Sequence, residues 1–171
     1  YVTTTHARGL QFRLDELNSA ACTGRTGVSD TFTSALWVLA TLFNLASVGV
    51  DGINVHTLPH AAYEPFSFTH QGKTWKAFVH PVYYGLKLFA DAFPPGAKLL
   101  SVSAPTGPVK VWATLDIAGR VRVVLINKDP SVSVSVRLQL PGSAAPATVE
   151  SLSAPSLSAT AGVTLGGQSF A

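Results

Sequence analysis

The sequence predicts an α/β region over residues 1–96 that is followed by an all-β region over residues 97–171. In the first region, two segments of alternating apolar and polar residues are each followed by a longer segment with apolar residues at helical spacing. In the second region, short alternating segments are separated by Pro, Gly and Ser. A β-α-β-α order favours parallel strands covered by helices, whereas regularly spaced short strands favour an antiparallel β-sandwich.

The first strand–helix unit begins with a predicted strand at residues 10–16. The residues that alternation places on one face of this strand are Leu10, Phe12, Leu14 and Glu16. A helix is expected to follow Ser29 or Asp30 as its N-cap and to stop at Gly49. Its apolar stripe consists of Phe32, Leu36, Leu39, Phe43 and Ala46.

The second unit begins with a short predicted strand at residues 50–56, and a loop over residues 57–76 follows it. Pro81 suits the first turn of the next predicted helix, and the Pro-Pro-Gly run at residues 94–96 ends it. The apolar stripe of this helix consists of Val82, Leu86, Phe89 and Phe93.

The all-β region contains several short predicted strands, at residues 109–117, 120–127, 131–140, 148–152 and 162–165. Ala118 and Gly119 join the first two as a tight hairpin. Residues 131–140 alternate almost perfectly, which predicts a strand with one apolar face. Regular strands with Pro, Gly and Ser turns predict a small antiparallel sandwich.

Composition and charge narrow the classes of function. The chain is 47% hydrophobic and 12% charged, and its net charge of +3 comes from 12 basic and 9 acidic residues. The basic residues form no cluster, so no nucleic-acid partner is expected. Polar residues interrupt the longest apolar run, so no membrane span is expected. The one cysteine, Cys22, excludes an intrachain disulfide.

The two predicted strand–helix units are too few for a closed fold. A (β/α)8 barrel needs eight such units and roughly 250 residues, and parallel strands need neighbours on each side and cover on both faces. We therefore expect residues 1–96 to be the last part of a partial barrel, completed by residues that precede Tyr1 in the functional molecule.

The carboxyl end of the first strand carries the candidate catalytic group. Catalytic side chains of barrels lie at the carboxyl ends of strands, and alternation turns Glu16 into the mouth while Asp15 faces the other way, near Arg13. A bulge at the strand end would reverse this assignment. A purely structural role for Glu16, as a loop cap or ion pair, is the alternative on pattern alone.

The segment DELNSAACTGRTGVSDTFTSALWVLATLFNLASVGVDGINVHT resembles glycoside hydrolase family 79, which contains heparanases and β-glucuronidases. In that family, a Glu at the end of barrel strand seven is followed by a small polar segment, a Gly-rich loop and a Ser-Asp-Thr-Phe helix start. HPVYYGLKLFADAF resembles the last barrel helix, and the later strands resemble the family's C-terminal β-domain. The resemblance thus covers nearly the whole chain.

The resemblance implies a retaining glycosidase of uronic-acid-containing sugars, with Glu16 as the nucleophile. Retaining sites need a second carboxyl group about 5–5.5 Å away as acid and base. In the family this second Glu follows an Asn on strand four, and no Asn-Glu pair occurs in this sequence. The chain is therefore expected to carry half of a catalytic pair and to be inactive when isolated.

Six residues are expected to contact the sugar, namely Tyr63, Asn18, Ser19, His56, Cys22 and Thr23. Tyr63 matches a family tyrosine that contacts the uronate carboxylate. Cys22 and Thr23 belong to a loop whose amides hold that carboxylate in the family, although relatives carry an aromatic residue and glycines there. Packing roles for Tyr63 and His56 are the alternatives. The histidines show no metal-ligand spacing, so no metal or cofactor is expected.

Two functions from different classes follow from these observations. The first is the nucleophile-bearing part of a retaining β-glycosidase, whose partners are a carbohydrate substrate and the N-terminal barrel half of the same protein. The second is a non-catalytic β-sandwich accessory or carbohydrate-binding module. The resemblance implies a secreted or extracellular protein and leaves open a glucuronide, a methylated glucuronide or a neutral sugar.

Overall fold

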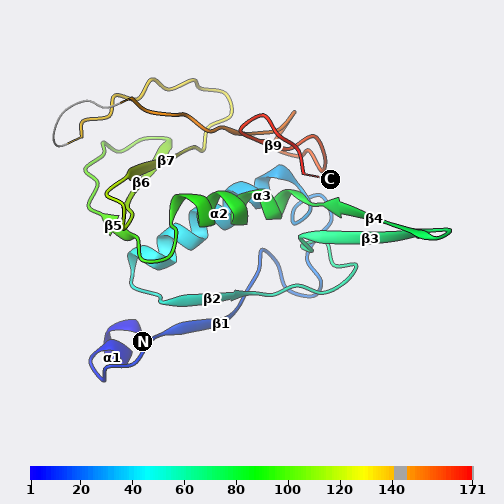
Figure 1. Cartoon of the computed structure of the whole chain (residues 1–171), viewed down its shortest axis with the longest axis horizontal. Helices are drawn as coiled ribbons and strands as arrows, with labels where there is room; N and C mark the ends of the chain where they lie inside the picture. Colours follow the sequence, from blue (N-terminus) through cyan, green and yellow to red (C-terminus); the bar gives the residue numbers. More distant parts are fainter. Residues whose placement is uncertain (141–145, 171) are drawn as a thin grey trace.

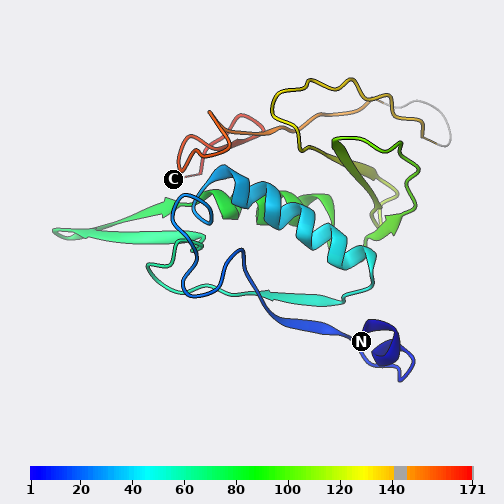
Figure 2. The same cartoon turned by 180° about the vertical axis from the view of Figure 1, so that it is seen from behind.

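The computed structural model describes residues 1–140 and 146–170, and it consists of layers stacked on a central pair of helices (Figure 1). A pair of parallel strands lies against one side of the helices, and the strands of the second half of the chain lie on the other side (Figure 2). Residues 141–145 and 171 of the predicted β region lie outside the described residues. None of the described helices is long and apolar enough to cross a membrane.

The first half of the chain contains the predicted β-α-β-α order. Its elements are β1 (Arg13–Leu17), α2 (Phe32–Ser47), β2 (Gly52–Val55) and α3 (Pro81–Ala92), preceded by the short helix α1 (Val2–His6). Strands β1 and β2 pair in parallel. The two small strands do not by themselves form a barrel, so the partial barrel remains a prediction.

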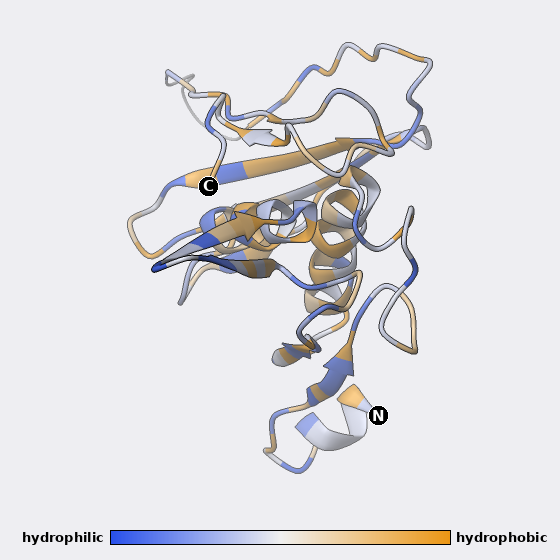
Figure 3. Cartoon of the chain, turned by 90° about the vertical axis from the view of Figure 1, so that its right-hand side faces the viewer, coloured by the Kyte–Doolittle hydropathy of each residue, from blue (hydrophilic) through white to orange (hydrophobic). Residues whose placement is uncertain are grey.

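Helices α2 and α3 cross closely at Gly85. A Cβ atom on Gly85 would lie 2.1 Å from the carbonyl oxygen of Ala35 and 2.6 Å from Cγ1 of Val38. Only a residue without a side chain allows the two backbones to approach so closely. Figure 3 shows that the paired helices are mostly hydrophobic along their length, as expected for a layer that is covered on both sides.

The start of α2 differs from the prediction. Neither Ser29 nor Asp30 is the N-cap, because Thr31 takes that position without a side-chain capping bond. Instead, the carbonyl oxygen of Ala159 accepts from the N–H of Phe32 at 2.8 Å, and the carbonyl oxygen of Leu157 accepts from the N–H of Thr33 at 3.0 Å. A C-terminal loop thus satisfies donors that side chains usually cap.

The predicted loop over residues 57–76 was wrong in its second half. An antiparallel hairpin occupies this position, formed by β3 (Phe66–Gln71) and β4 (Thr74–Val79). The turn residue Gly72 has a φ of 62°, which suits the first position of a two-residue hairpin turn.

The second half contains two small antiparallel sheets. The first consists of β5 (Lys98–Leu100), β6 (Val109–Leu115) and β7 (Val121–Asn127), and the predicted hairpin between the last two is confirmed. The second consists of β8 (Leu152–Ser153) and β9 (Thr164–Leu165). Its strands are shorter than the predictions at residues 148–152 and 162–165.

The predicted strand at residues 131–140 is not found. Although the segment alternates, it joins no strand ladder among the described residues, and its apolar side chains, such as Val134 at 41% and Leu140 at 56%, are exposed. Alternation specifies a face but does not supply a hydrogen-bonding neighbour, and a strand needs both.

The first sheet and the helices share one core. Leu39, Phe43 and Ala92 pack with Trp112 and Val124 of the sheet, and the rings of Phe43 and Trp112 are stacked with centroids 5.3 Å apart. Side chains on both sides of the predicted boundary at residue 96 therefore pack together. The boundary itself remains a prediction.

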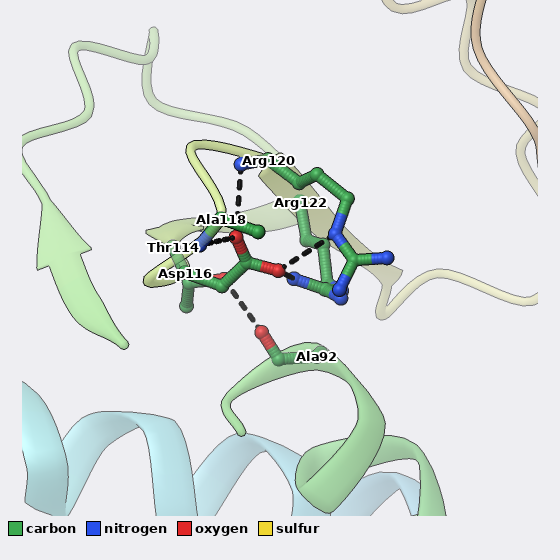
Figure 4. Close-up of polar contacts among 6 residues, drawn as sticks. All are labelled: Ala92, Thr114, Asp116, Ala118, Arg120 and Arg122. Atoms are coloured by element: carbon green, nitrogen blue, oxygen red, sulfur yellow. Dashed lines mark hydrogen bonds and ion pairs between the residues drawn. The ribbon is translucent and has the colours of Figure 1, made fainter. Parts of the chain in front are cut away.

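Asp116 organises the turn between β6 and β7 (Figure 4). Its carboxylate accepts from the backbone N–H groups of Ala118 and Arg120, from Nε of Arg120 at 2.9 Å and from Nη1 of Arg122 at 2.8 Å. The Arg120 backbone bond, followed by the Arg122 bond, holds the pKa of Asp116 well below its usual range. Beside it, Oγ1 of Thr114 donates to the carbonyl oxygen of Ala92 at 2.5 Å and ties the sheet to α3.

We expect Asp116→Asn to lower the thermal midpoint by several degrees at pH 7, because the amide places an NH2 group where four donors converge. Since its folded pKa is depressed, Asp116 stabilises the fold above about pH 4, and this stabilisation is lost as pH falls through the folded pKa. The midpoint of the wild type should therefore fall more steeply below pH 4 than that of the variant. Circular dichroism melts from pH 7 to pH 2 measure both.

The control for this prediction is Asp91→Asn, which removes a partly exposed ion pair with Lys87 on α3. Exposed pairs of this kind contribute little, so its midpoint should stay close to that of the wild type. Parallel acid profiles for the wild type and Asp116→Asn would contradict the role given to Asp116.

Candidate active site

A cleft of about 400 Å³ opens where β1 and β2 end. Its walls come from the loop after β1 and the loop after β2, and its lining residues are Glu16, Asn18, Ala20, Ala21, Cys22, Thr23, His56, Leu58 and Tyr63. The structure thus brings together every predicted site residue except Ser19. The sequence reasoning did not single out Ala20, Ala21 and Leu58, whose small or apolar side chains carry no chemical signal.

A bulge in β1 determines which acid reaches the cleft. Leu14 lies opposite Ile53 and Leu17 opposite Val55, so three residues of β1 advance along two residues of β2. Leu17 and Ile53 both pack on the helices, and Leu14 lies on their face by register. The predicted common face of Leu14 and Glu16 was therefore wrong, because the bulge interrupts the alternation.

Although the alternation fails, the acid that lines the cleft is Glu16 and not Asp15. The Glu16 side chain is 74% exposed, and its Oε1 lies 4.0 Å from Nδ1 of His56. Among the described residues that line the cleft, Glu16 is the single carboxylate. A carboxylate in this position is free to meet a ligand and has a histidine as its nearest ionisable neighbour.

Asn18 joins the two walls of the cleft. Its Nδ2 donates to the carbonyl oxygen of His56 at 2.5 Å, and its Oδ1 accepts from the N–H of Ser19 at 2.6 Å. The hydroxyl of Ser19 bonds that of Ser29 at 2.8 Å, behind the cleft. Asn18 thus ties the ends of β1 and β2 together, whereas Ser19 ties the loop after β1 to the segment before α2 and does not line the cleft.

The loop after β1 contains a left-handed turn at residues 22–24, of which Cys22 and Thr23 line the cleft. Cys22, Thr23 and Gly24 have φ angles of 56°, 68° and 81°. This conformation is costly for Thr23, whose side chain is branched at Cβ. The turn is held from the other wall, because the carbonyl oxygen of Thr23 accepts from the N–H of Ala62 at 2.8 Å.

Tyr63 completes the second wall and is 4% exposed. Its ring meets His56 edge-on, with centroids 5.7 Å apart, and it covers Gly24 so closely that a Cβ there would lie 2.8 Å from Cδ1 of Tyr63. These contacts fix the tyrosine ring between the two loops.

Glu64 anchors the loop that presents Tyr63, a role that the sequence reasoning missed. Its Oε2 accepts from the N–H of His60 at 2.8 Å, and its Oε1 lies 3.7 Å from Nε2 of His80. His80 in turn bonds the hydroxyl of Ser67 at 2.7 Å. The signal in the sequence for this role is that Glu64 is the single acidic residue of the predicted loop over residues 57–76, which also contains histidines. No three potential metal ligands gather within residues 1–140 and 146–170.

Comparison with known proteins finds a family match within the second half of the chain. No curated protein matches the chain. Residues 111–171, about a third of the chain, match the family model described as the glycosyl hydrolase family 79 C-terminal beta domain. The match begins within β6 and lies outside the cleft, whose residues it does not test. As the resemblance of the later strands predicted, residues 111–171 are similar to the C-terminal beta domain of glycosyl hydrolase family 79.

Proposed function

We propose that this chain is the nucleophile-bearing part of a retaining β-glycosidase that acts on β-glucuronides or related uronic-acid glycans. The observation that carries the proposal is the exposed carboxylate of Glu16 in a cleft at the carboxyl ends of parallel strands, in a chain whose second half matches a glycosidase family.

The proposed reaction follows the retaining course. A carboxylate oxygen of Glu16 bonds to the anomeric carbon while the bond from this carbon to the glycosidic oxygen breaks. The leaving oxygen takes a proton from a carboxylic acid on another barrel strand. Water then attacks the glycosyl ester, gives its proton to that same group and releases Glu16.

The other cleft residues have positioning and binding roles in this proposal. Asn18 and His56 hold the strand ends around Glu16, and Nδ1 of His56 lies 4.0 Å from Oε1 of Glu16. The phenol of Tyr63 is a suitable donor to a sugar carboxylate. Cys22 and Thr23 line the same cleft, and their backbone amides are suitable further donors to that carboxylate.

Two features support completion of the barrel by residues outside this sequence. Among the described residues, β1 and β2 pair only with each other, so each has an unpaired outer edge. Beside β2, an apolar cavity of about 320 Å³ is lined by Leu42, Ile53, Leu86 and Phe89, among others. A further strand and helix of a barrel would cover these surfaces.

An activated 2-deoxy-2-fluoro β-glucuronide tests the proposal in a protein that contains the complete barrel. The fluorine slows hydrolysis of the glycosyl ester, so one sugar unit should accumulate on the peptide that carries Glu16. Labelling of Asp15 would reassign the nucleophile. Absence of labelling, with the protein folded, would favour the non-catalytic carbohydrate-binding module.

The isolated 171-residue chain is expected to give no turnover of a chromogenic β-glucuronide, because no second carboxyl group lines the described cleft. Release of the chromophore measures this, with a no-protein blank as reference. Clear turnover that Glu16→Gln abolishes would show that an acid partner is present after all.

A further inference from the structure

The hairpin β3–β4 projects from the body at the end where β1 and β2 stop (Figures 1 and 2). Its strands pair over six positions, from Phe66 with Val79 to Gln71 with Thr74. Nearly all of its residues are exposed, including those between Phe68 and Phe78. An isolated two-stranded hairpin is marginal in water, so this element has little packing of its own to stabilise it.

One face of the hairpin is aromatic. By register, Phe66, Phe68 and His70 share a face with Trp75, and the His70 and Trp75 rings lie 4.8 Å apart. Phe68 is 59% exposed and Trp75 is 68% exposed. Although Phe66 rests on Tyr83 of α3, the outer part of this face meets only solvent. Gathered exposed aromatic side chains mark interaction surfaces.

The hairpin is also cationic. Lys73 lies in the turn two residues before Trp75, Lys76 lies on the opposite face by register, and no Asp or Glu occurs between residues 65 and 90. The hydrophilic tip that Figure 3 shows therefore carries positive charge without a local counter-ion. A surface that combines an aromatic ring with lysines suits a ligand with apolar faces and repeated negative charges.

We propose that the hairpin β3–β4 binds an extended anionic polysaccharide, with Trp75 stacking on a sugar ring and Lys73, in the adjoining turn, pairing with a uronate carboxylate. This inference rests on the proposed function, because such a polymer is the substrate class of the cleft. Two residues separate Tyr63 at the cleft from Phe66 at the base of β3. The hairpin thus holds sugars beyond the one that meets Glu16.

Titration of the full 171-residue chain with hyaluronan, a polymer that contains β-linked glucuronate, tests the proposal through Trp fluorescence. Binding should be absent with neutral dextran. It should be weaker at 0.5 M NaCl, because added salt screens the attraction between exposed charges. Trp75→Ala should lower the affinity at least about tenfold; its binding is measured by affinity electrophoresis, which does not need the Trp signal.

Matched lysine variants separate a site from general charge attraction. Lys73→Ala should weaken binding, whereas Lys110→Ala, which removes an exposed lysine from the other half of the chain, should leave it unchanged. Equal weakening by both lysine variants, or wild-type affinity for Trp75→Ala, would overturn the proposal. Binding of the wild type to dextran would also overturn it, as would failure to bind hyaluronan.

The two proposals can fail separately. In a protein with the complete barrel, Trp75→Ala should raise KM for hyaluronan and leave hydrolysis of a small chromogenic β-glucuronide unchanged. Loss of activity on the small substrate would place Trp75 in the cleft and contradict a distal site. Retained activity of Glu16→Gln would remove the proposed function, while polymer binding by the hairpin would still be measured independently.

Discussion

Glu16→Gln is expected to lower hydrolysis of a β-glucuronide by about 10⁴-fold or more in a protein that contains the complete barrel. The amide has nearly the same shape as the carboxylate, but it cannot form the glycosyl ester. Because the side chain is 74% exposed, its replacement should leave the fold intact. Steady-state kinetics measure the loss, and circular dichroism checks the fold.

The adjacent acid supplies a matched control. Asp15→Asn changes the charge by the same amount at an exposed position that does not line the cleft, so it should retain nearly full activity. Glu16→Ala leaves room for azide, which should restore turnover of a substrate with a good leaving group and give a glycosyl azide of inverted configuration. A mild loss in Glu16→Gln, or a large loss in Asp15→Asn, would remove Glu16 from the nucleophile role.

Gly85→Ala is expected to destabilise the chain by about 2 kcal/mol or more. Alanine favours a helix over glycine by about 1 kcal/mol, but the added methyl would lie 2.1 Å from a backbone carbonyl of α2. A backbone atom cannot move away as a flexible side chain can, so the two helices must separate. Urea unfolding of the full chain, followed by circular dichroism, measures the net change.

Gly107→Ala is the control, because a Cβ at that position would meet no atom within 4 Å. Its midpoint should stay close to that of the wild type. If Gly85→Ala proved as stable as this control, the close helix crossing would not limit the packing of α2 on α3.

The sequence predicted the helices and the turn whose residues are specified by their immediate neighbours in the chain. Apolar spacing, Pro81 and the Pro-Pro-Gly run placed the two long helices, and Ala118-Gly119 placed the β6–β7 turn. The gathering of the cleft residues followed from the rule that parallel strands present their carboxyl ends together. The roles of these residues remain predictions, since the family match lies elsewhere in the chain.

Features that depend on distant partners could not be predicted. The bulge in β1 depends on its register with β2, so alternation alone misplaced Leu14 relative to Glu16. The segment 131–140 has the pattern of a strand but no neighbour in the described structure. The hairpin β3–β4 was not predicted for a different reason: residues 57–76 are rich in His, Ala, Pro and aromatic residues, a composition that suggested a loop although Gly72 supplies a hairpin turn.

The hydrogen bonds that the first N–H groups of α2 donate to the carbonyl oxygens of Ala159 and Leu157 have a consequence for biosynthesis. Thr33 and Leu157 are 124 residues apart, so a ribosome must translate most of the chain before the first turn of α2 finds its acceptors. Until then this turn remains hydrated or frayed. The two halves should therefore reach their final form together late in translation, rather than one after the other.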